Sequence, residues 1–206
     1  MIKRNIHVLC ITETHVQECQ EYICDNGFLV ILSGDDTEAP SHTGVGFIIA
    51  PCMKPSLIGS TLFSNRIAAI KLKCKHGRIA ITCAYAPHNG HPVRNRSRFF
   101  SQLSQFHASI SVNGPKFLFG DLNSRIHVRR AGEHEIIGPY VFGDPAAVCS
   151  ITKNRSFLLE MCSSLQLCIA NTFFNHAIEN QVTYWGIGAT RSYTNDSYFS
   201  PCFCPT

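Results

Sequence analysis

The sequence lacks any uninterrupted apolar run close to the roughly 20 residues that a membrane-spanning helix needs. We expect no secretory leader either, because the apolar run over residues 7–11, behind Lys3 and Arg4, is too short for a signal peptide. A disulfide framework is missing as well, since the eleven cysteines are odd in number and irregularly spaced. We therefore expect an intracellular protein in a reducing compartment, with no membrane partner.

The sequence is also poor in charged residues, and its net charge is small. Charged residues make up 16% of the chain and hydrophobic residues 45%, which is an ordinary globular balance. The net charge of +4 is compatible with a polyanionic partner, but it is too small to identify one. Much of the basic excess lies in two runs, Arg94, Arg96 and Arg98, and then Arg125, Arg129 and Arg130. Each run is either a solvated face or a phosphate-binding surface.

The pattern of apolar residues predicts a strand-rich α/β domain. We expect strands over residues 6–11, 28–32, 45–50, 70–75, 78–85, 116–120, 167–170 and 181–185. Residues 99–110 and 157–165 have helical spacing, residues 12–25 form a short helix or loop, and residues 122–154 are irregular. Hairpins and strand–helix–strand units occur together, so two packed, mixed sheets with flanking helices fit best. A length of 206 residues suits one domain.

Two smaller features of these strands carry expectations. Cys10, Cys74, Cys83 and Cys168 lie in apolar runs, where a free cysteine behaves as a small core residue. His76-Gly77 supplies the turn of the hairpin formed by residues 70–85. The lysines that alternate with apolar residues before this turn keep an exposed strand face soluble, or contact DNA.

Polar residues stand at the ends of three predicted strands. Glu13 has the parity of Leu9 and Ile11, so it points to the same side as the core residues of its strand. Tyr85 has the parity of Cys83. Asp121 follows the run over 116–120 with inward parity, and Asn123 comes two residues later. We expect these four side chains to meet at one rim of the sandwich.

Carboxylates, a phenol and an amide form a hard, oxygen-rich set of ligands, which suits Mg²⁺ or Mn²⁺ and not zinc. Such an ion can clamp a phosphate oxygen while a carboxylate orients the attacking water. Each residue also has a purely structural explanation. Glu13 can cap a helix, Asp121-Leu122-Asn123 can be an ordinary turn, and Tyr85 can be a core residue with a hydrated hydroxyl.

Short sequence words around these residues resemble those of the endonuclease/exonuclease/phosphatase superfamily. The words come in family order over about residues 6 to 185. They are Leu9 to His15 ("L-x-x-Q-E-T-H"), Thr43 to Phe47 ("G-G-V-G-F"), Ile81 to Pro87 ("N-V-Y-A-P"), Phe119 to Asn123 ("G-D-F-N") and Ser156 to Phe173 ("L…L-x-I-x-N-T"). The forms of the first, third and last words are most similar to endonuclease domains of non-long-terminal-repeat retrotransposons.

The resemblance implies a four-layer α/β sandwich, nicking of DNA with Mg²⁺ or Mn²⁺, and a nuclear location if the protein is functional. It implies Glu13 as metal ligand and Asp121 as the carboxylate that orients or activates the water. Tyr85 and Asn123 would bind phosphate, Thr183 would match a family threonine, and His15 would lie near the substrate. The arginines expected to bind substrate are Arg94, Arg96, Arg98 and Arg125.

The sequence departs from the family pattern in two places. The family has an asparagine metal ligand upstream of the segment that begins here at Met1. After Ser192 it has an isoleucine–aspartate pair and later a serine–aspartate–histidine, whereas residues 190–206 form a divergent tail with Asp196 one position out of register. We therefore expect this chain to have little or no nuclease activity.

Two other interpretations stay open. One is a different phosphoesterase of the same fold, such as an abasic-site endonuclease, a phosphoinositide phosphatase or a poly(A) nuclease. The other is a non-enzymatic remnant that binds nucleic acid through its arginines.

Overall fold

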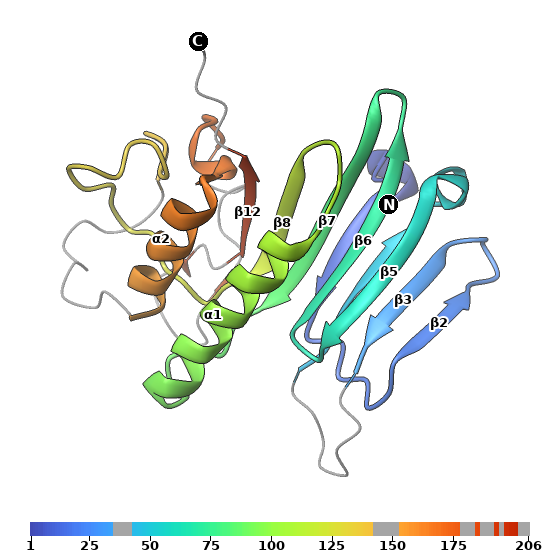
Figure 1. Cartoon of the computed structure of the whole chain (residues 1–206), viewed down its shortest axis with the longest axis horizontal. Coiled ribbons are helices and arrows are strands. Elements are labelled where there is room, and N and C mark those ends of the chain that lie inside the picture. The colour runs from blue at the N-terminus through green and yellow to red at the C-terminus, as the bar shows by residue number, and fades with distance from the viewer. Residues whose placement is uncertain (35–42, 142–152, 178–183, 186–191, 194–195, 202–206) are drawn as a thin grey trace. The chain divides into compact units, whose positions relative to one another are not determined.

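The computed structural model describes residues 1–34, 43–141, 153–177, 184–185, 192–193 and 196–201 (Figure 1). These residues belong to two units, each considered by itself below. Unit 1 is Met1–Tyr85 with Ile110–Gly120, and unit 2 is Ala86–Ser109 with Asp121–Thr206. No helix among the described residues is long and apolar enough to cross a bilayer.

Unit 1 begins with a short 3₁₀ helix, η1 (Ile2–Arg4), and then builds an antiparallel sheet in the order β1-β4-β3-β2. Its strands are β1 (Val8–Thr12), β2 (Gln20–Ile23), β3 (Leu29–Ser33) and β4 (Val45–Ile49). The strand expected over residues 28–32 is confirmed as β3, and all five residues of β3 are buried. The prediction of a short helix or loop over residues 12–25 was wrong for residues 20–23, which form β2. This edge strand is exposed at all four positions, so it has no apolar periodicity that reveals it.

The second sheet of unit 1 follows a 3₁₀ turn, η2 (Pro51–Ser56). Its strands β5 (Leu57–Ser64), β6 (Ile67–Cys74), β7 (Gly77–Tyr85) and β8 (Lys116–Asp121) lie side by side in that order (Figure 1). The predicted hairpin is confirmed, but Cys74 pairs with Gly77, so the two-residue turn is Lys75-His76. Gly77 opens β7 at a φ of 144°, a conformation that favours glycine. The sequence did not predict β5, whose middle is exposed.

The apolar faces of the two sheets pack against each other. Leu29, Ile31, Val45, Phe47 and Ile49 of the first sheet share one buried cluster with residues of β6 and β7. The members from those two strands are Ala68, Ile70, Leu72, Ile81, Cys83 and Tyr85. Two packed sheets accompanied by helices confirm the predicted α/β sandwich.

The four cysteines expected in the core differ in burial. Cys83 is buried, Cys10 and Cys168 are partly buried, and Cys74 is exposed. A hydrogen bond with the Cys83 thiol, together with burial, raises the pKa of Cys10 well above its ordinary value. Cys10 and Cys83 therefore behave as core residues. The expectation for Cys74 was wrong, because this residue ends β6 beside the solvent-exposed hairpin turn.

Unit 2 contains two packed helices and short strands. Helix α1 (Val93–Ser109) buries Phe99, Leu103 and Phe106 at the predicted helical spacing. It packs on α2 (Lys153–Leu165), with the rings of Phe100 and Phe157 5.8 Å apart. The remaining elements are β9 (Leu167–Ile169), η4 (Ala170–Thr172), β10 (Tyr184–Trp185), β11 (Ser192–Tyr193) and β12 (Asp196–Pro201), with β9 paired to β12 and β10 to β11.

An ion pair ties the irregular segment after β8 to α2. The guanidinium of Arg155 donates to both carboxylate oxygens of Glu133, at 2.8 and 2.6 Å, and to the carbonyl of Val128 at 2.9 Å. Partial burial acts to raise the pKa of Glu133, but hydrogen bonds from Arg155 and from the Arg130 backbone outweigh it and lower the pKa. The ionised carboxylate thus belongs to the folded state.

We expect Glu133→Gln to lower the free energy of unfolding at neutral pH by about 3 kcal/mol, because it leaves a buried guanidinium uncompensated. A depressed folded-state pKa gives stability that is present above the unfolded value and lost as pH falls through the folded value. The difference from the parent chain should therefore persist at pH 7 and shrink below about pH 4 in urea titrations.

Glu160→Gln, at an exposed position of α2, is the matched control and should change stability by less than about 0.5 kcal/mol. A Glu133→Gln deficit that is the same at pH 3 and pH 7 would contradict the assigned pKa shift.

Candidate active site

A hydrogen bond joins two predicted site residues of unit 1 that are far apart in the sequence. The Tyr85 hydroxyl donates to Glu13 Oε1 at 2.5 Å. Glu13 directly follows β1, and Tyr85 is the last residue of β7. The two strands lie on opposite sides of the inter-sheet core. A second contact joins the same two strands, because Cys83 Sγ of β7 donates to the carbonyl of Ile11 in β1 at 3.4 Å. The contact expected between Glu13 and Tyr85 is therefore present, and the inward parity of Tyr85 is confirmed. The parity predicted for Glu13 was wrong, because Val8 and Cys10 are the β1 residues that pack against the inter-sheet core, and Glu13 reaches Tyr85 from beyond the strand end at a φ of 55°.

Arg66 is a neighbour of this pair that the sequence did not reveal. Its guanidinium lies over the Tyr85 ring, 5.0 Å from the ring centre, and donates to the Tyr85 carbonyl at 3.2 Å. A cation over an aromatic face is favourable by about 0.5–2 kcal/mol. Arg66 holds Tyr85 from the turn between β5 and β6, outside every family-like word, so only the pairing of these strands could identify it.

The backbone around Glu13 is unusual for a strand end. Glu13 and His15 both have a φ of 55°, in the left-handed region that costs ordinary residues of order 1–3 kcal/mol. The His15 amide donates to the Thr43 carbonyl at 2.8 Å, and the Thr14 amide donates to the Gly44 carbonyl at 3.3 Å. The family-like words that begin at Leu9 and at Thr43 are thus joined by backbone hydrogen bonds, which leave Glu13 and His15 exposed.

In unit 2, Asp121 and Asn123 form a hydrogen-bonded turn. The Asn123 amide donates to Asp121 Oδ1 at 2.8 Å, with Asn123 at a φ of 48°. The Asn123 side chain donates from Nδ2 to the Ala86 carbonyl, and the Ala86 amide donates to the Asp121 carbonyl, both at 2.8 Å. The word that starts at Phe119 is therefore bonded to the residue that follows Tyr85.

Close packing explains the glycine before Asp121. Gly120 has a φ of 141°, and a side chain there would collide with the carbonyl oxygen of Ala84 in β7. Only glycine lets β8 approach β7 in this conformation. Gly120 thus sets the position from which Asp121 emerges.

The predicted arginines have different surroundings. Arg94 and Arg98 are exposed on the first turns of α1, and Arg125 is half-buried. Arg96 is buried, and it donates to His91 O, Asn89 Oδ1 and Asn154 Oδ1 at 3.1, 2.9 and 3.1 Å. The substrate-binding role predicted for Arg96 is therefore corrected. On a helix, residue 96 faces the core with Phe99 and Phe100, whereas Arg94 and Arg98 face outward.

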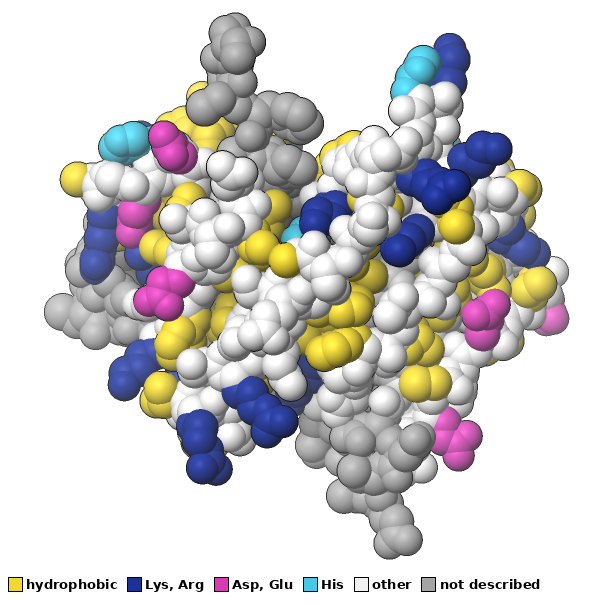
Figure 2. All heavy atoms as spheres, in the orientation of Figure 1, with side chains coloured by type: hydrophobic (Ala, Val, Ile, Leu, Met, Phe, Trp, Pro, Cys, Tyr) yellow, Lys and Arg dark blue, Asp and Glu magenta, His cyan; other side chains and the backbone are white. Residues whose placement is uncertain are grey.

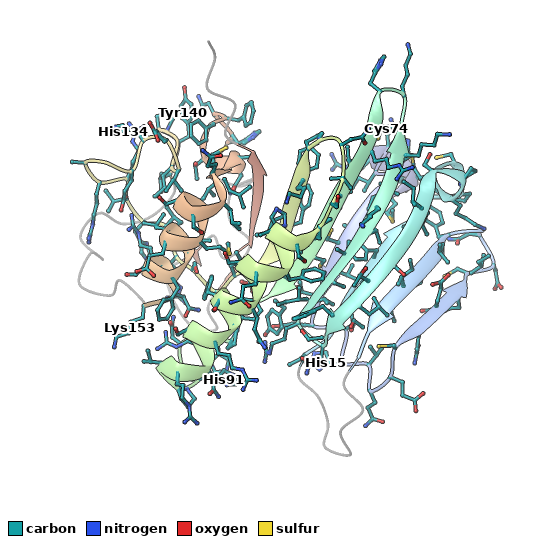
Figure 3. The ribbon with its side chains drawn as sticks, viewed as in Figure 1. His15, Cys74, His91, His134, Tyr140 and Lys153 are labelled. Carbon is teal, nitrogen blue, oxygen red and sulfur yellow. The ribbon has the colours of Figure 1, made fainter. Side chains whose placement is uncertain are left out.

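Figure 2 shows lysine and arginine side chains gathered near the first turns of α1 and α2. Figure 3 labels His91 and Lys153 at the same ends of these helices. Thr183 lies outside the described residues, so its predicted role stays a prediction.

Oxygen donors dominate the two clusters that the structure shows. The Glu13 carboxylate and the Tyr85 hydroxyl are the groups of unit 1, and the Asp121 carboxylate and the Asn123 amide are those of unit 2. A hard divalent cation prefers such ligands. Among the described residues, no group of three or more histidine, cysteine, aspartate or glutamate side chains could hold a metal ion by itself. The donor types fit Mg²⁺ or Mn²⁺ bound through few protein ligands.

The described fold is similar to solved structures of endonuclease/exonuclease/phosphatase proteins. The endonuclease domain of TRAS1, a telomere-specific non-LTR retrotransposon, is 12% identical over 96% of this chain and 73% of that chain, with a TM-score of 0.53. A family protein from Leptotrichia buccalis is 10% identical over 96% and 76%, with a TM-score of 0.61. An AP endonuclease from Leishmania major is 12% identical over 98% and 71%, with a TM-score of 0.63.

No protein-family model and no curated protein matches the sequence. At these low identities the structural likeness shows the fold alone. The chain has the endonuclease/exonuclease/phosphatase fold, as the ordered sequence words predicted.

We expect Gly120→Ala to lower the free energy of unfolding by about 2–3 kcal/mol, because it combines a left-handed strain with a clash against the Ala84 backbone. Gly59→Ala, in β5, is the matched control, since no described heavy atom lies within 4 Å of a side chain placed there. Urea unfolding of both variants tests this, and equal stability losses would show that Gly120 has no special packing role.

Proposed function

We propose that this chain is a Mg²⁺-dependent phosphodiesterase that acts on DNA, as an endonuclease of the retrotransposon type. The observation that carries the proposal is the 2.5 Å hydrogen bond between Glu13 and Tyr85. The two residues are 72 positions apart in the sequence, belong to two different family-like words, and lie at the ends of different strands. The fold supports it, because the similar solved structures include an endonuclease domain of a retrotransposon and an AP endonuclease.

In this proposal each residue has a role that its chemistry allows. The Glu13 carboxylate would hold Mg²⁺, which as a Lewis acid would neutralise charge on a phosphate oxygen. The Asn123 amide would donate to a phosphate oxygen, where negative charge grows during the reaction. The Tyr85 hydroxyl has a single proton, so it would donate to phosphate only after Mg²⁺ binding frees that proton from Glu13. The Asp121 carboxylate would accept a proton from the water whose oxygen bonds to phosphorus as the phosphorus–oxygen bond to the leaving group breaks. Thr183 is assigned by resemblance alone.

His15 and the outward arginines Arg94 and Arg98 would contact the substrate. Both arginines are exposed on the first two turns of α1, and guanidinium groups are suited to phosphate. Arg125 is half-buried and follows Asn123 by two residues in the sequence, so it would contact the substrate nearer to the Asp121–Asn123 turn. The low activity expected from the divergent tail belongs to this proposal as well.

Because we expect the parent chain to nick supercoiled plasmid only weakly with Mg²⁺, Asp121→Asn should reduce this residual nicking to the background rate by removing the proton acceptor. Glu13→Gln should weaken Mn²⁺ binding measured by calorimetry, a readout that needs no turnover. If the two residues serve one site, the double variant should lose no more activity than the worse single variant.

Nicking that survives Asp121→Asn would contradict the proposed role. The preferred substrate is tested in the same assay with plasmid, abasic duplex, poly(A) and an inositol phosphate. Preference for the abasic duplex would favour the second candidate, an abasic-site endonuclease, to which the TM-score of 0.63 with the Leishmania major enzyme points.

Binding to random duplex DNA should weaken steeply as salt rises, since it would be directed at phosphates. Arg94→Gln and Arg98→Gln should each reduce the slope of log K against log salt by about 0.9, the value for one lost phosphate contact. Lys73→Gln, at an exposed position of β6, is the control that separates a specific surface from general charge. An equal effect of all three substitutions on fluorescence-anisotropy titrations would assign no binding role to α1.

A further inference from the structure

Asn154, in the first turn of α2, is a fully buried polar residue outside the roles assigned above. Its exposed fraction is 0%, and every hydrogen of its side-chain amide has a described acceptor. Nδ2 donates to the carbonyl of Pro87 at 3.0 Å and to the carbonyl of Asn123 at 3.2 Å. Oδ1 accepts from the Arg96 guanidinium at 3.1 Å. A buried polar group is stable only with such partners, so the position is built around an asparagine.

Both carbonyls that Asn154 binds belong to segments of the candidate active site. Pro87 is two residues after Tyr85, and Asn123 is the predicted phosphate ligand. The same segments are already joined by the Ala86 amide to Asp121 O and by Asn123 Nδ2 to Ala86 O. Asn154 adds two more hydrogen bonds between these segments, to the carbonyls of Pro87 and Asn123. Neither segment is part of a helix at these positions, so side-chain donors take the place of regular pairing.

Arg96 fixes the orientation of the Asn154 amide. A guanidinium only donates, so the group facing it must be Oδ1, and Nδ2 must face the carbonyls. Arg96 also donates to Asn89 Oδ1 and to His91 O, which extends the network along the loop before α1. Its acceptors in this network are neutral oxygens, so its role here is directional rather than charge-compensating.

We propose that Asn154 is a positioning residue, which holds Asn123 and the segment after Tyr85 in the geometry needed for phosphodiester hydrolysis. The proposal rests on the proposed function, and Asn154 itself contacts neither substrate nor metal. Asn123 has a φ of 48°, a left-handed conformation that asparagine tolerates, and the Asn154 amide fixes the position of its carbonyl. A displacement of about 1 Å at a reacting group costs on the order of 10²-fold in rate, so support of this kind has a measurable effect.

The first test measures structure and needs no activity. Asn154→Asp keeps the size and the acceptor for Arg96, but its carboxylate cannot donate to Pro87 O or Asn123 O. We expect hydrogen exchange of the Ala86 and Asn123 amides to accelerate at least tenfold, with β6 amides unchanged. Glu160→Gln, at an exposed position of the same helix, is the matched control and should leave the Ala86 and Asn123 amides protected.

The second test measures turnover of nicked plasmid below the unfolding temperature. We expect kcat of Asn154→Asp to fall about 10–100-fold with KM within about twofold, and Glu160→Gln to keep the parent kcat. Unchanged amide exchange in Asn154→Asp would overturn the inference, as would faster exchange with an unchanged kcat. The parent chain is expected to nick only weakly, so the exchange result decides the contact even where turnover is too slow to measure. A complete absence of metal-dependent cleavage counts against the proposed function and not against the contact.

Arg96→Lys is the second variant in case Asn154→Asp does not fold. A lysine cannot reproduce the forked contacts to Asn89, His91 and Asn154, so the amide should lose its orientation. We expect the same faster exchange at Ala86 and Asn123, and full protection there would overturn the inference.

Discussion

The burial of two apolar sheet faces against each other is the interaction on which the candidate site in unit 1 depends. Complete burial of a large aliphatic side chain contributes roughly 1.5–3 kcal/mol, and the inter-sheet cluster contains eleven buried residues. A single hydrogen bond such as Tyr85–Glu13 contributes about 1–3 kcal/mol at most. The core therefore sets the distance between β1 and β7, and the hydrogen bond follows from that distance rather than creating it.

The candidate site segments of unit 2 are stabilised differently, because residues 86–88 and 122–124 are neither strand nor helix. The turn at Asp121–Asn123 and the residues after Tyr85 have backbone carbonyls and amides that no regular ladder satisfies. The side chains of Asn123, Asn154 and Arg96 satisfy them instead, and Arg155 does the same for Val128. Buried polar side chains at the start of α2 thus give this irregular region a defined geometry, which an apolar contact would not specify.

Much of the fold was predictable from alternation and helical spacing. Strands β1, β3, β4, β6, β7 and β8 and both helices lie where their apolar patterns indicated, because each buries a face of regular period. The exposed strands β2 and β5 were not predictable, since solvent imposes no period on them. The burial of Arg96 and the exposure of Cys74 were likewise hidden, because residue type suggested the opposite environment in each case.

The candidate site residues were predictable from the ordered words, but their supporting residues were not. Glu13, Tyr85, Asp121 and Asn123 lie in words of fixed spacing. Arg66 and Asn154 support them across 19 and 31 residues of sequence, through contacts that only tertiary structure creates. Convergence of the Glu13–Tyr85 pair and the Asp121–Asn123 turn on one phosphate stays a prediction of the sequence.

Backbone strain gives an independent reason to regard these residues as a site. Among the described residues, five that are not glycine have a positive φ, and Glu13, His15 and Asn123 are three of them. A left-handed conformation is unfavourable for a glutamate, whereas histidine and asparagine adopt it more readily. Contacts from distant parts of the sequence hold the backbone near these residues, namely the Thr43 and Gly44 carbonyls in unit 1 and the Asn154 amide in unit 2. Because the strain is local and its compensation is remote, the supporting residues control the site geometry without taking part in the chemistry.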